Sequence, residues 1–397
     1  MTDPLGQSQV LPYIAGLSEL GYSFTLISCE KPDRFKQFSK KINEYCSTHG
    51  IVWKPLPYHK KPPVLSTLYD YFRLRRSALE IYKSREISLV HCRSYIPSLI
   101  GNELKVKKGI KFVFDMRGFW ADERVDGGLW NISNPVYRWV YRFFKRQERQ
   151  FIQHADSIVS LTEAGRSEIQ NWDSWKQNKN EITVVPCSAD FEHFQLLNDA
   201  QKYSNRVAMG IGKDQFVLSY LGSLGTWYLL DEMLLFFRSI KSQKQTALFL
   251  IVTPESPDIV YEKARKLGIS KESIHVCFKT RQDLVDTLSV SDLSISFIKP
   301  AYSKISSSPT KLGELLAMGI PVICNSGVGD VKEIVEKIDG GIVLDSLDTE
   351  SFDKIVTNLD SLNTLNRQTI REKAMEYYSL TKAVNKYADV YKSILGQ

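Results

Sequence analysis

The chain has 397 residues, of which 43% are hydrophobic and 24% charged, and its formal net charge is +7 at pH 7. This length suits two domains of ordinary size, and the composition excludes a disordered chain. No apolar run approaches the roughly 18 residues that a membrane span requires, and the N-terminus has neither a secretory nor a transit pattern. The six cysteines are scattered without a CxxC pair, which predicts buried thiols in a reducing cytoplasm.

In the first half of the chain, short apolar segments alternate with helical or loop segments. The predicted strands cover residues 23–28, 89–92, 111–116, 157–162 and 182–186. Nearly continuous apolar strands separated by helices are typical of a parallel sheet covered on both faces. The segment "CSADFEHFQ" (187–195) follows a proline-containing turn and marks a domain boundary.

A second series of the same kind follows this boundary. Its predicted strands cover residues 216–222, 247–253, 274–278, 293–297, 321–325 and 341–344. The C-terminal segment is helical in pattern and has no strand after it. The sequence therefore predicts an α/β protein with two Rossmann-like domains.

The segment "SKISSSPTKLGELLAMGIPVICNS" (303–326) concentrates turn residues before a predicted helix. Pro309 suits a first helical turn, the serines suit capping, and free N–H groups at a helix start attract an anion. The segment follows the strand at 293–297, so it lies at the carboxyl end of the sheet, where open α/β sheets bind ligands. Lys311 and Glu314 would share one helix face there, as a cation for phosphate and a carboxylate for hydroxyls. The alternative is a capped helix with a surface Lys–Glu pair.

The chain resembles glycosyltransferase family 4, which has the GT-B fold, in segments that occur in family order. These segments are "DPLGQSQVLPYIAGLSELGY", "FDMRGFWADER", "SIVSLTEAGRSEI", "VVPCSADFEHF", "YLGSLGTWYLLDEM" and "SSPTKLGELLAMGIPVI". The resemblance implies two Rossmann-like domains that face each other across a cleft. We expect an acceptor-binding domain at 1–188, a nucleotide-sugar-binding domain at 189–370, and a C-terminal helix at 371–397 that returns to the first domain.

The resemblance also implies an activity. It is the transfer of a sugar, with retention of configuration, from a nucleoside diphosphate sugar to a saccharide or lipid-linked saccharide acceptor in surface polysaccharide biosynthesis. No cofactor or obligatory metal is implied. A rival interpretation is a GT-B enzyme of another reaction, such as a nucleotide-sugar epimerase or a phosphorylase, although no phosphorylase-like cofactor lysine is evident.

The family's motif of two glutamates separated by seven residues is only half present. Glu314 matches the second glutamate, which the resemblance assigns to the nucleotide ribose, whereas Ser306 occupies the first position. The resemblance therefore transfers the donor-sugar contact of the missing glutamate to Ser307, Ser308 and Thr310.

A second departure follows "YLG", where many family members carry an arginine and a lysine for the diphosphate. Here residues 223–228 read "SLGTWY", beginning with Ser223. Lys304 and Lys311 are the expected replacements. Gly222 still allows the backbone to come close to the ligand.

The glycine-containing loop lies at the start of the chain, where Gly6 follows Leu5, and the resemblance places this glycine at the donor. The family has a strand ahead of this loop, yet only two residues precede Asp3. Either the chain is truncated before Met1 or the first sheet lacks its usual inner strand. An open position of that kind exposes strand edges to pairing.

The candidate catalytic residues follow the strand at 111–116. Asp115 lies roughly where many family members place a catalytic-site histidine, and Arg117 opposes it. We expect Asp115 to bind acceptor or donor hydroxyls, with Asp122 and Glu123 as alternatives. A plain Asp–Arg pair that closes a loop is the competing interpretation.

The first half of the chain is basic, with 28 Lys and Arg against 20 Asp and Glu in residues 1–190, a net charge of +8. Segment 136–153 places Arg138, Arg142, Lys145 and Arg149 at helical spacing, with aromatic residues on other faces. Such a helix can lie on an anionic membrane, or it can simply be a solvated face. A nucleic-acid-binding protein is a rival from another class, but the chain lacks RRM, KH, helix-turn-helix and zinc patterns, so we expect no nucleic-acid partner.

Overall fold

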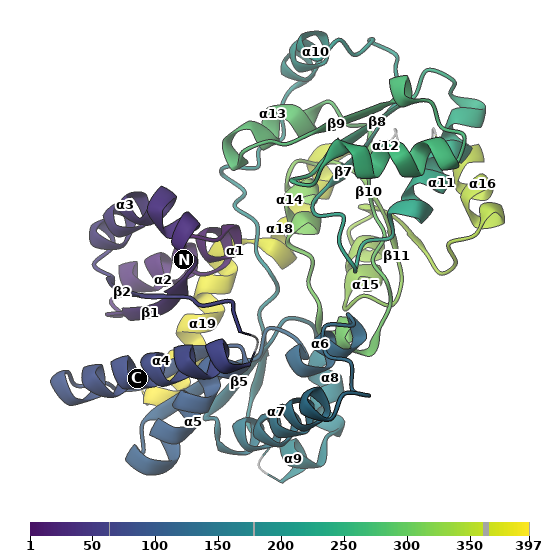
Figure 1. Cartoon of the computed structure of the whole chain (residues 1–397). Coiled ribbons are helices and arrows are strands. Elements are labelled where there is room, and N and C mark those ends of the chain that lie inside the picture. Colours follow the sequence, from purple (N-terminus) through teal and green to yellow (C-terminus); the bar gives the residue numbers. More distant parts are fainter. Residues whose placement is uncertain (63, 178, 360–364, 397) are drawn as a thin grey trace. The chain divides into compact units, whose positions relative to one another are not determined.

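A computed structural model describes residues 1–62, 64–177, 179–359 and 365–396, and it divides into two compact units (Figure 1). The first unit comprises Met1–Pro186 and Leu380–Gln397, and the second comprises Cys187–Ser379. The chain returns to the first unit at Leu380 and not at residue 371. The backbone at Ser379 is extended and separates two helices where a single one was expected.

The first unit contains two parallel sheets. One has the order β1-β2 and the other the order β3-β4-β5-β6. The strands are β1 (Thr25–Glu30), β2 (Val52–Pro57), β3 (Leu89–Arg93), β4 (Lys111–Asp115), β5 (Ser157–Ser160) and β6 (Ile182–Val184). Every predicted strand of this half is present. Strand β2 was not predicted because Pro55 and Pro57 disfavour a strand, and it pairs with β1 alone, as a proline-containing edge strand does.

Helices cover both sheets of the first unit. They are α1 (Pro4–Gln9), α2 (Leu11–Glu19), α3 (Pro32–Thr48), α4 (Leu65–Ser84), α5 (Tyr95–Lys108), α6 (Trp120–Asp126), α7 (Pro135–His154), α8 (Glu163–Asn171), α9 (Asp173–Lys176) and α19 (Leu380–Leu395). Helix α19, yellow in Figure 1, packs against α2. Its buried Tyr387 and Tyr391 form edge-to-face ring pairs with Tyr13 and Tyr22, which anchors the C-terminal segment in this unit.

The second unit has one parallel sheet with the order β12-β11-β10-β7-β8-β9. The strands are β7 (Val217–Leu221), β8 (Leu248–Val252), β9 (Ile274–Cys277), β10 (Leu293–Ser296), β11 (Val322–Asn325) and β12 (Gly341–Leu344), as predicted. Successive residues such as Val217 and Leu218 belong to two separate hydrophobic clusters, so both faces of this sheet are buried.

Helices of the second unit cover the two faces of this sheet. They are α10 (Asp199–Ala208), α11 (Leu230–Gln243), α12 (Pro257–Lys266), α13 (Leu284–Ser289), α14 (Thr310–Ala317), α15 (Val331–Lys337), α16 (Thr349–Thr357) and α18 (Arg367–Tyr378), with short 3-10 turns η1 (Lys271–Ser273), η2 (Arg281–Asp283) and η3 (Tyr302–Ser306). Strand β10 ends just before η3 and α14, so the predicted phosphate segment does lie at the carboxyl edge of the sheet. Among the described residues, no helix is long and apolar enough to cross a membrane.

Candidate functional site

Lys311 occupies the first turn of α14 and is 8% exposed. Its Nζ donates to the Tyr220 hydroxyl at 3.2 Å and lies 3.7 Å from the centre of the Tyr228 ring. Burial lowers the pKa of Lys311 to about 7, because a charged ammonium loses its hydration there. Within the described part of the chain, no carboxylate forms an ion pair with this lysine. The site therefore holds a buried cation without a counter-charge.

Gly222, after β7, lies beside this lysine. Its φ of +130° is a backbone conformation that other residues rarely adopt, and a Cβ built there would lie 3.1 Å from the Lys311 Nζ. Ser223 follows and is exposed, and its carbonyl accepts a hydrogen bond from the Tyr220 hydroxyl. The structure thus brings the predicted residues Gly222, Ser223 and Lys311 together.

Lys304, in η3, is 7% exposed, and its Nζ lies 3.7 Å from the centre of the Trp227 ring. Trp227 and Tyr228 both come from the "SLGTWY" segment, so each of the two lysines contacts one aromatic ring of that segment. These cation–π contacts hold the ammonium groups in place without neutralising them. These contacts of Trp227 and Tyr228 were not predicted, although the two adjacent aromatic residues in the segment could have indicated them.

Glu314 does not pair with Lys311. Its carboxylate accepts from the Arg281 guanidinium at 3.2 Å, and burial raises its pKa to about 7 even though Arg281 acts in the opposite direction. Arg281, in η2, also stacks on the Phe194 ring at 4.9 Å. Sequence reasoning missed Arg281 because it lies on a different element from Glu314 and no local pattern connects the two.

The serines ahead of α14 do not have the predicted capping role. Pro309 is the N-cap residue, not a residue of the first turn, and no side chain caps the helix. The Ser308 hydroxyl instead accepts from the backbone N–H of Cys187 at 3.1 Å, while Ser306 and Ser307 end η3. Proline fixes an extended backbone at the N-cap position, which leaves the serine side chains free for other partners. Thr310 begins the helix beside Lys311.

The candidate catalytic residues lie in the first unit, where Asp115 is 1% exposed. Its carboxylate accepts from the Tyr387 hydroxyl at 3.0 Å and lies 3.4 Å from both the His91 ring and the Arg93 guanidinium. Arg117 lies 3.9 Å away. Burial alone would raise the pKa of Asp115, but Arg117, His91 and Arg93 outweigh it and hold that pKa at about 2. Asp115 is therefore an anion that lies among Arg93, Arg117 and the His91 ring.

The chain that follows β4 contains Arg117 and the alternative candidate Asp122. Arg117, two residues after the end of β4, has a φ of +54°, an uncommon conformation for a residue with a Cβ. Of the alternatives, Asp122 is already bound, because it accepts from Tyr141 at 2.8 Å and from Lys145 at 2.9 Å.

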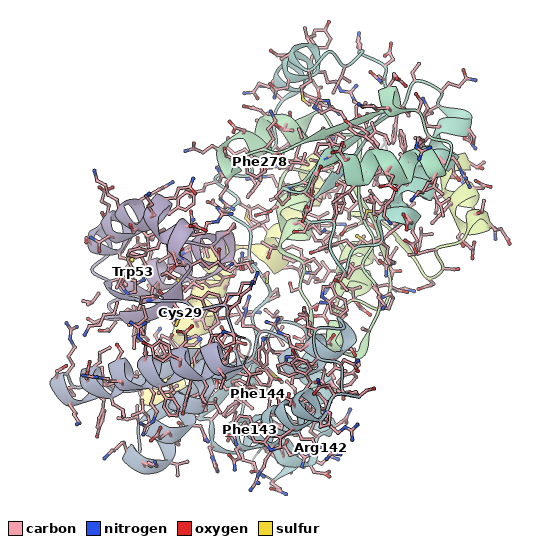
Figure 2. The ribbon with its side chains drawn as sticks, in the orientation of Figure 1. Cys29, Trp53, Arg142, Phe143, Phe144 and Phe278 are labelled. Carbon is pink, nitrogen blue, oxygen red and sulfur yellow. The ribbon has the colours of Figure 1, made fainter. Side chains whose placement is uncertain are left out.

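The predicted basic stripe of α7 is only partly exposed. Arg138, Arg142 and Arg149 are exposed, and Figure 2 labels Arg142 together with the neighbouring Phe143 and the buried Phe144. Lys145 instead turns inward, where it forms ion pairs with Asp122 and Glu148. The prediction was wrong for Lys145 because α6 places a carboxylate against that face of the helix.

At the start of the chain, Gly6 lies in α1 and packs directly on the backbone of Met1, since a Cβ at Gly6 would lie 2.7 Å from the Met1 Cα. Leu5, its neighbour, is 65% exposed. These two residues belong to the first unit, whereas the lysines described above belong to the second.

Comparisons with known proteins identify the family and the fold. Residues 6–188 match the family described as "Glycosyl transferase 4-like domain", and residues 201–376 match "Glycosyl transferases group 1". No curated protein sequence matches the chain.

Several solved structures share the fold. A glycosyltransferase from Rickettsia africae has a TM-score of 0.71 at 17% identity, covering 99% of this chain and 96% of that one. Anabaena HepE in complex with UDP-glucose has a TM-score of 0.64 at 12% identity, covering 94% and 99%. WaaG, a glycosyltransferase involved in lipopolysaccharide biosynthesis, has a TM-score of 0.59 at 16% identity, covering 93% and 98%. With its two α/β units of parallel strands and both family matches, the chain belongs to the GT-B glycosyltransferases of the family 4 type.

Proposed function

We propose that this glycosyltransferase transfers a sugar, with retention of configuration, from a nucleoside diphosphate sugar to a saccharide or lipid-linked saccharide acceptor in surface polysaccharide assembly. The second unit would bind the donor and the first unit the acceptor. The complex of HepE with UDP-glucose supports the donor class, and the role of WaaG in lipopolysaccharide biosynthesis supports the acceptor class.

The uncompensated charge of Lys311 carries the donor assignment. A buried ammonium without an anionic partner costs free energy, and that cost falls when a ligand supplies the anion. A diphosphate at the carboxyl edge of the sheet would do so, and it would also meet the N–H groups of the first turn of α14. Lys304 would supply a second positive charge.

The same groups would also assist the reaction. Glycosyl transfer passes through an oxocarbenium-like state as the diphosphate leaves, so fixed positive charges near the leaving oxygens stabilise that state more than the bound substrate. In the proposal, Lys311 and Lys304 perform this task and no resident metal is required. Glu314, held by Arg281, would accept hydrogen bonds from the ribose hydroxyls.

A thermal-shift screen with UDP, GDP, ADP and TDP, and with their sugar conjugates, tests the proposal. A nucleotide that binds only the folded protein raises the melting temperature, by an amount that grows with its concentration relative to the dissociation constant. We expect one base to give a clearly larger shift than the others. Its sugar conjugates should then be screened for transfer to saccharide and lipid-linked acceptors. If no nucleotide raises the melting temperature, the donor assignment fails.

The pKa of Lys311 predicts a pH dependence of donor binding. Only the ammonium form attracts the diphosphate, and in the free protein that form is lost as the pH rises through about 7. Binding an anion raises this pKa, so affinity for the diphosphate should fall by up to about tenfold per pH unit above pH 7. Titration calorimetry between pH 7 and pH 9 measures the slope. Lys311→Met is the control and should give a clearly shallower profile, in which only Glu314, whose pKa is also about 7, still titrates. An equal slope in both proteins would assign the effect to another group.

The exposed arginines of α7 predict weak binding to anionic membranes. Arg138, Arg142 and Arg149 lie on the same helix as Trp139, which is 66% exposed and stacks on Phe143. Each arginine near an anionic surface contributes about 1 kcal/mol, and salt screens most of it. We expect co-sedimentation with anionic vesicles at low salt, and its loss when the three arginines are replaced by glutamine.

The control variant for this experiment removes the same number of positive charges from another helix of the first unit. Lys36, Lys40 and Lys41 on α3 are exposed, and their replacement by glutamine removes three charges without touching α7. Equal loss of binding in both triple variants would show that net charge, and not the α7 surface, causes the attraction. No binding of the unaltered protein would leave the stripe as a solvated helix face.

A further inference from the structure

The N-terminal half of α4 has an exposed apolar face. Large side chains at positions i, i+3, i+4 and i+7 lie on one side of a helix. Here these side chains are 63%, 48%, 55% and 56% exposed, in the order Leu65, Leu68, Tyr69 and Phe72. A single exposed apolar residue is ordinary, but a contiguous group marks a surface that meets a partner. These four residues are called the α4 apolar face below.

The opposite side of α4 is buried, although its first turns are polar there. Ser66 and Asp70 are 6% and 7% exposed, and Leu74 continues this side of the helix into a hydrophobic cluster. The backbone N–H of His59 donates to the Asp70 carboxylate at 2.7 Å, and the His59 ring Nδ1 lies 2.6 Å from that carboxylate. A rotation of α4 that buried its apolar face would break both contacts and remove Leu74 from its cluster. These contacts therefore keep the apolar face on the outside.

The charged residues around the α4 apolar face are almost all basic. Residues 58–76 contain five Lys and Arg but one acidic residue, which is the buried Asp70. Lys60 and Lys61 are exposed in the loop ahead of the helix, and the Arg73 guanidinium lies 5.6 Å from the centre of one ring of the apolar face. An apolar surface with a basic rim fits an anionic lipid bilayer, because the acyl chains accept the apolar side chains and the headgroups attract the cations.

A second copy of this chain fits the same face less well. In a two-fold dimer the patch would meet itself, so Lys60 and Lys61 of both copies would lie together and repel each other. A fluid bilayer, in contrast, adapts to the outer side of a helix. Tyr58 and Tyr69, which are 38% and 55% exposed, are of a residue type that favours the membrane–water interface.

The α4 apolar face also borders the same groove as the aromatic residues of α7. Leu68 of α4 and Trp139 and Phe143 of α7 line this groove, and both helices belong to the first unit (Figure 1). The two surfaces can therefore contact one membrane. The arginines of α7 supply an attraction that salt screens, whereas the contribution of inserted apolar side chains does not depend on charge.

We propose that the α4 apolar face inserts into the interfacial region of an anionic lipid bilayer, with Lys60 and Lys61 at the headgroups. This goes beyond the proposed function, because it assigns a second membrane-binding surface outside the donor site, the catalytic candidates and the arginines of α7. It does not depend on which donor or acceptor the enzyme uses.

The test compares the unaltered chain with two triple variants. The first variant changes the α4 apolar face by Leu65→Gln, Leu68→Gln and Phe72→Gln. The control variant changes residues of α5 and α10 that are 62%, 52% and 59% exposed, by Val106→Gln, Tyr203→Gln and Val207→Gln. All six positions are exposed and glutamine is a good helix former, so both variants should fold, which their melting temperatures verify. Each protein is mixed with vesicles of phosphatidylcholine and phosphatidylglycerol, and co-sedimentation and amide hydrogen exchange at residues 64–72 are measured.

We expect the α4 variant to bind the vesicles at least about tenfold more weakly than the unaltered chain, and the control variant to stay within about twofold of it. In the unaltered chain, vesicles should slow exchange at residues 64–72 by about tenfold or more, a result that needs no variant. Equal binding by the α4 variant, or equal weakening in both variants, would overturn the proposal. So would co-sedimentation without slower exchange at these residues, and so would failure of the unaltered chain to bind.

Size-exclusion chromatography without lipid is the last measurement. We expect the unaltered chain and the α4 variant to elute at the same size. A dimer that the α4 variant abolishes would identify a second copy as the occupant of this face and would overturn the assignment to a bilayer.

Discussion

Replacing Lys311 by methionine is expected to stabilise the folded protein and to weaken nucleoside diphosphate binding in the same variant. Burial lowers the pKa of this lysine from 10.5 to about 7, so the charged form is less favourable in the folded protein than in the unfolded chain. Below pH 7 the lysine is protonated in both the folded and the unfolded protein, so burial of the ammonium lowers the folding stability by its full amount. As the pH rises from about 7 to 10.5, this loss of stability disappears. Methionine has a similar shape without the charge, so the variant should unfold at a higher temperature at pH 7.

Affinity should change in the opposite direction. Loss of a charge-assisted hydrogen bond to the diphosphate costs about 1–3 kcal/mol, which is roughly a 5- to 150-fold increase in the dissociation constant. Titration calorimetry and thermal unfolding of the same preparation measure both quantities. Glu314→Gln is the companion variant and should weaken binding by a similar amount, because it would lose the hydroxyl contacts. If Lys311→Met binds the diphosphate as well as the original protein does, Lys311 is a structural residue and the donor site lies elsewhere.

Asp115→Asn is expected to lower turnover about 100-fold or more while leaving nucleoside diphosphate affinity nearly unchanged. Affinity should persist because Asp115 lies in the first unit and the proposed diphosphate site lies in the second. Turnover should fall because the anion that holds Arg93, Arg117 and His91 disappears, and with it the proposed contact to substrate hydroxyls. Steady-state kinetics on the folded fraction measure turnover, and calorimetry measures the affinity for the nucleoside diphosphate.

The same substitution should also destabilise the protein, because it removes the buried anion that the partly exposed Arg93 and Arg117 contact, although the cost should stay below the about 3–5 kcal/mol of a fully buried pair. The folded-state pKa of Asp115, about 2, lies below its ordinary value of 3.8. Its contribution to stability is therefore present above pH 3.8 and is lost as the pH falls through 2. Tyr387→Phe is the matched control, since it removes one hydrogen bond to Asp115 and keeps the charges. If turnover in both variants falls only as far as the folded fraction falls, Asp115 has a structural role.

The sequence by itself determined the strands of both halves except β2, and it placed the segment 303–326 at the carboxyl edge of the second sheet. Runs such as "LFLIV" in β8 are apolar at every position, which only a strand buried on both faces requires, and this signal is local. Lys311 could be placed for the same reason, because a lysine shortly after β10 must lie at the carboxyl edge of a parallel sheet. Strand β2 was not predictable in this way, since its prolines contradict the local signal and only pairing with β1 stabilises it.

Only the tertiary structure decided which partner each charged side chain has. Helical spacing placed Lys145 in line with Arg138 and Arg142, but Asp122 and Glu148 draw it inward. Glu314 contacts Arg281 from another element, and Asp115 contacts Tyr387, which lies 272 residues further along the chain. Periodicity determines the face of an element on which a residue lies. The element that covers this face depends on how distant segments pack, and burial there also shifts the pKa values of Lys311, Glu314 and Asp115.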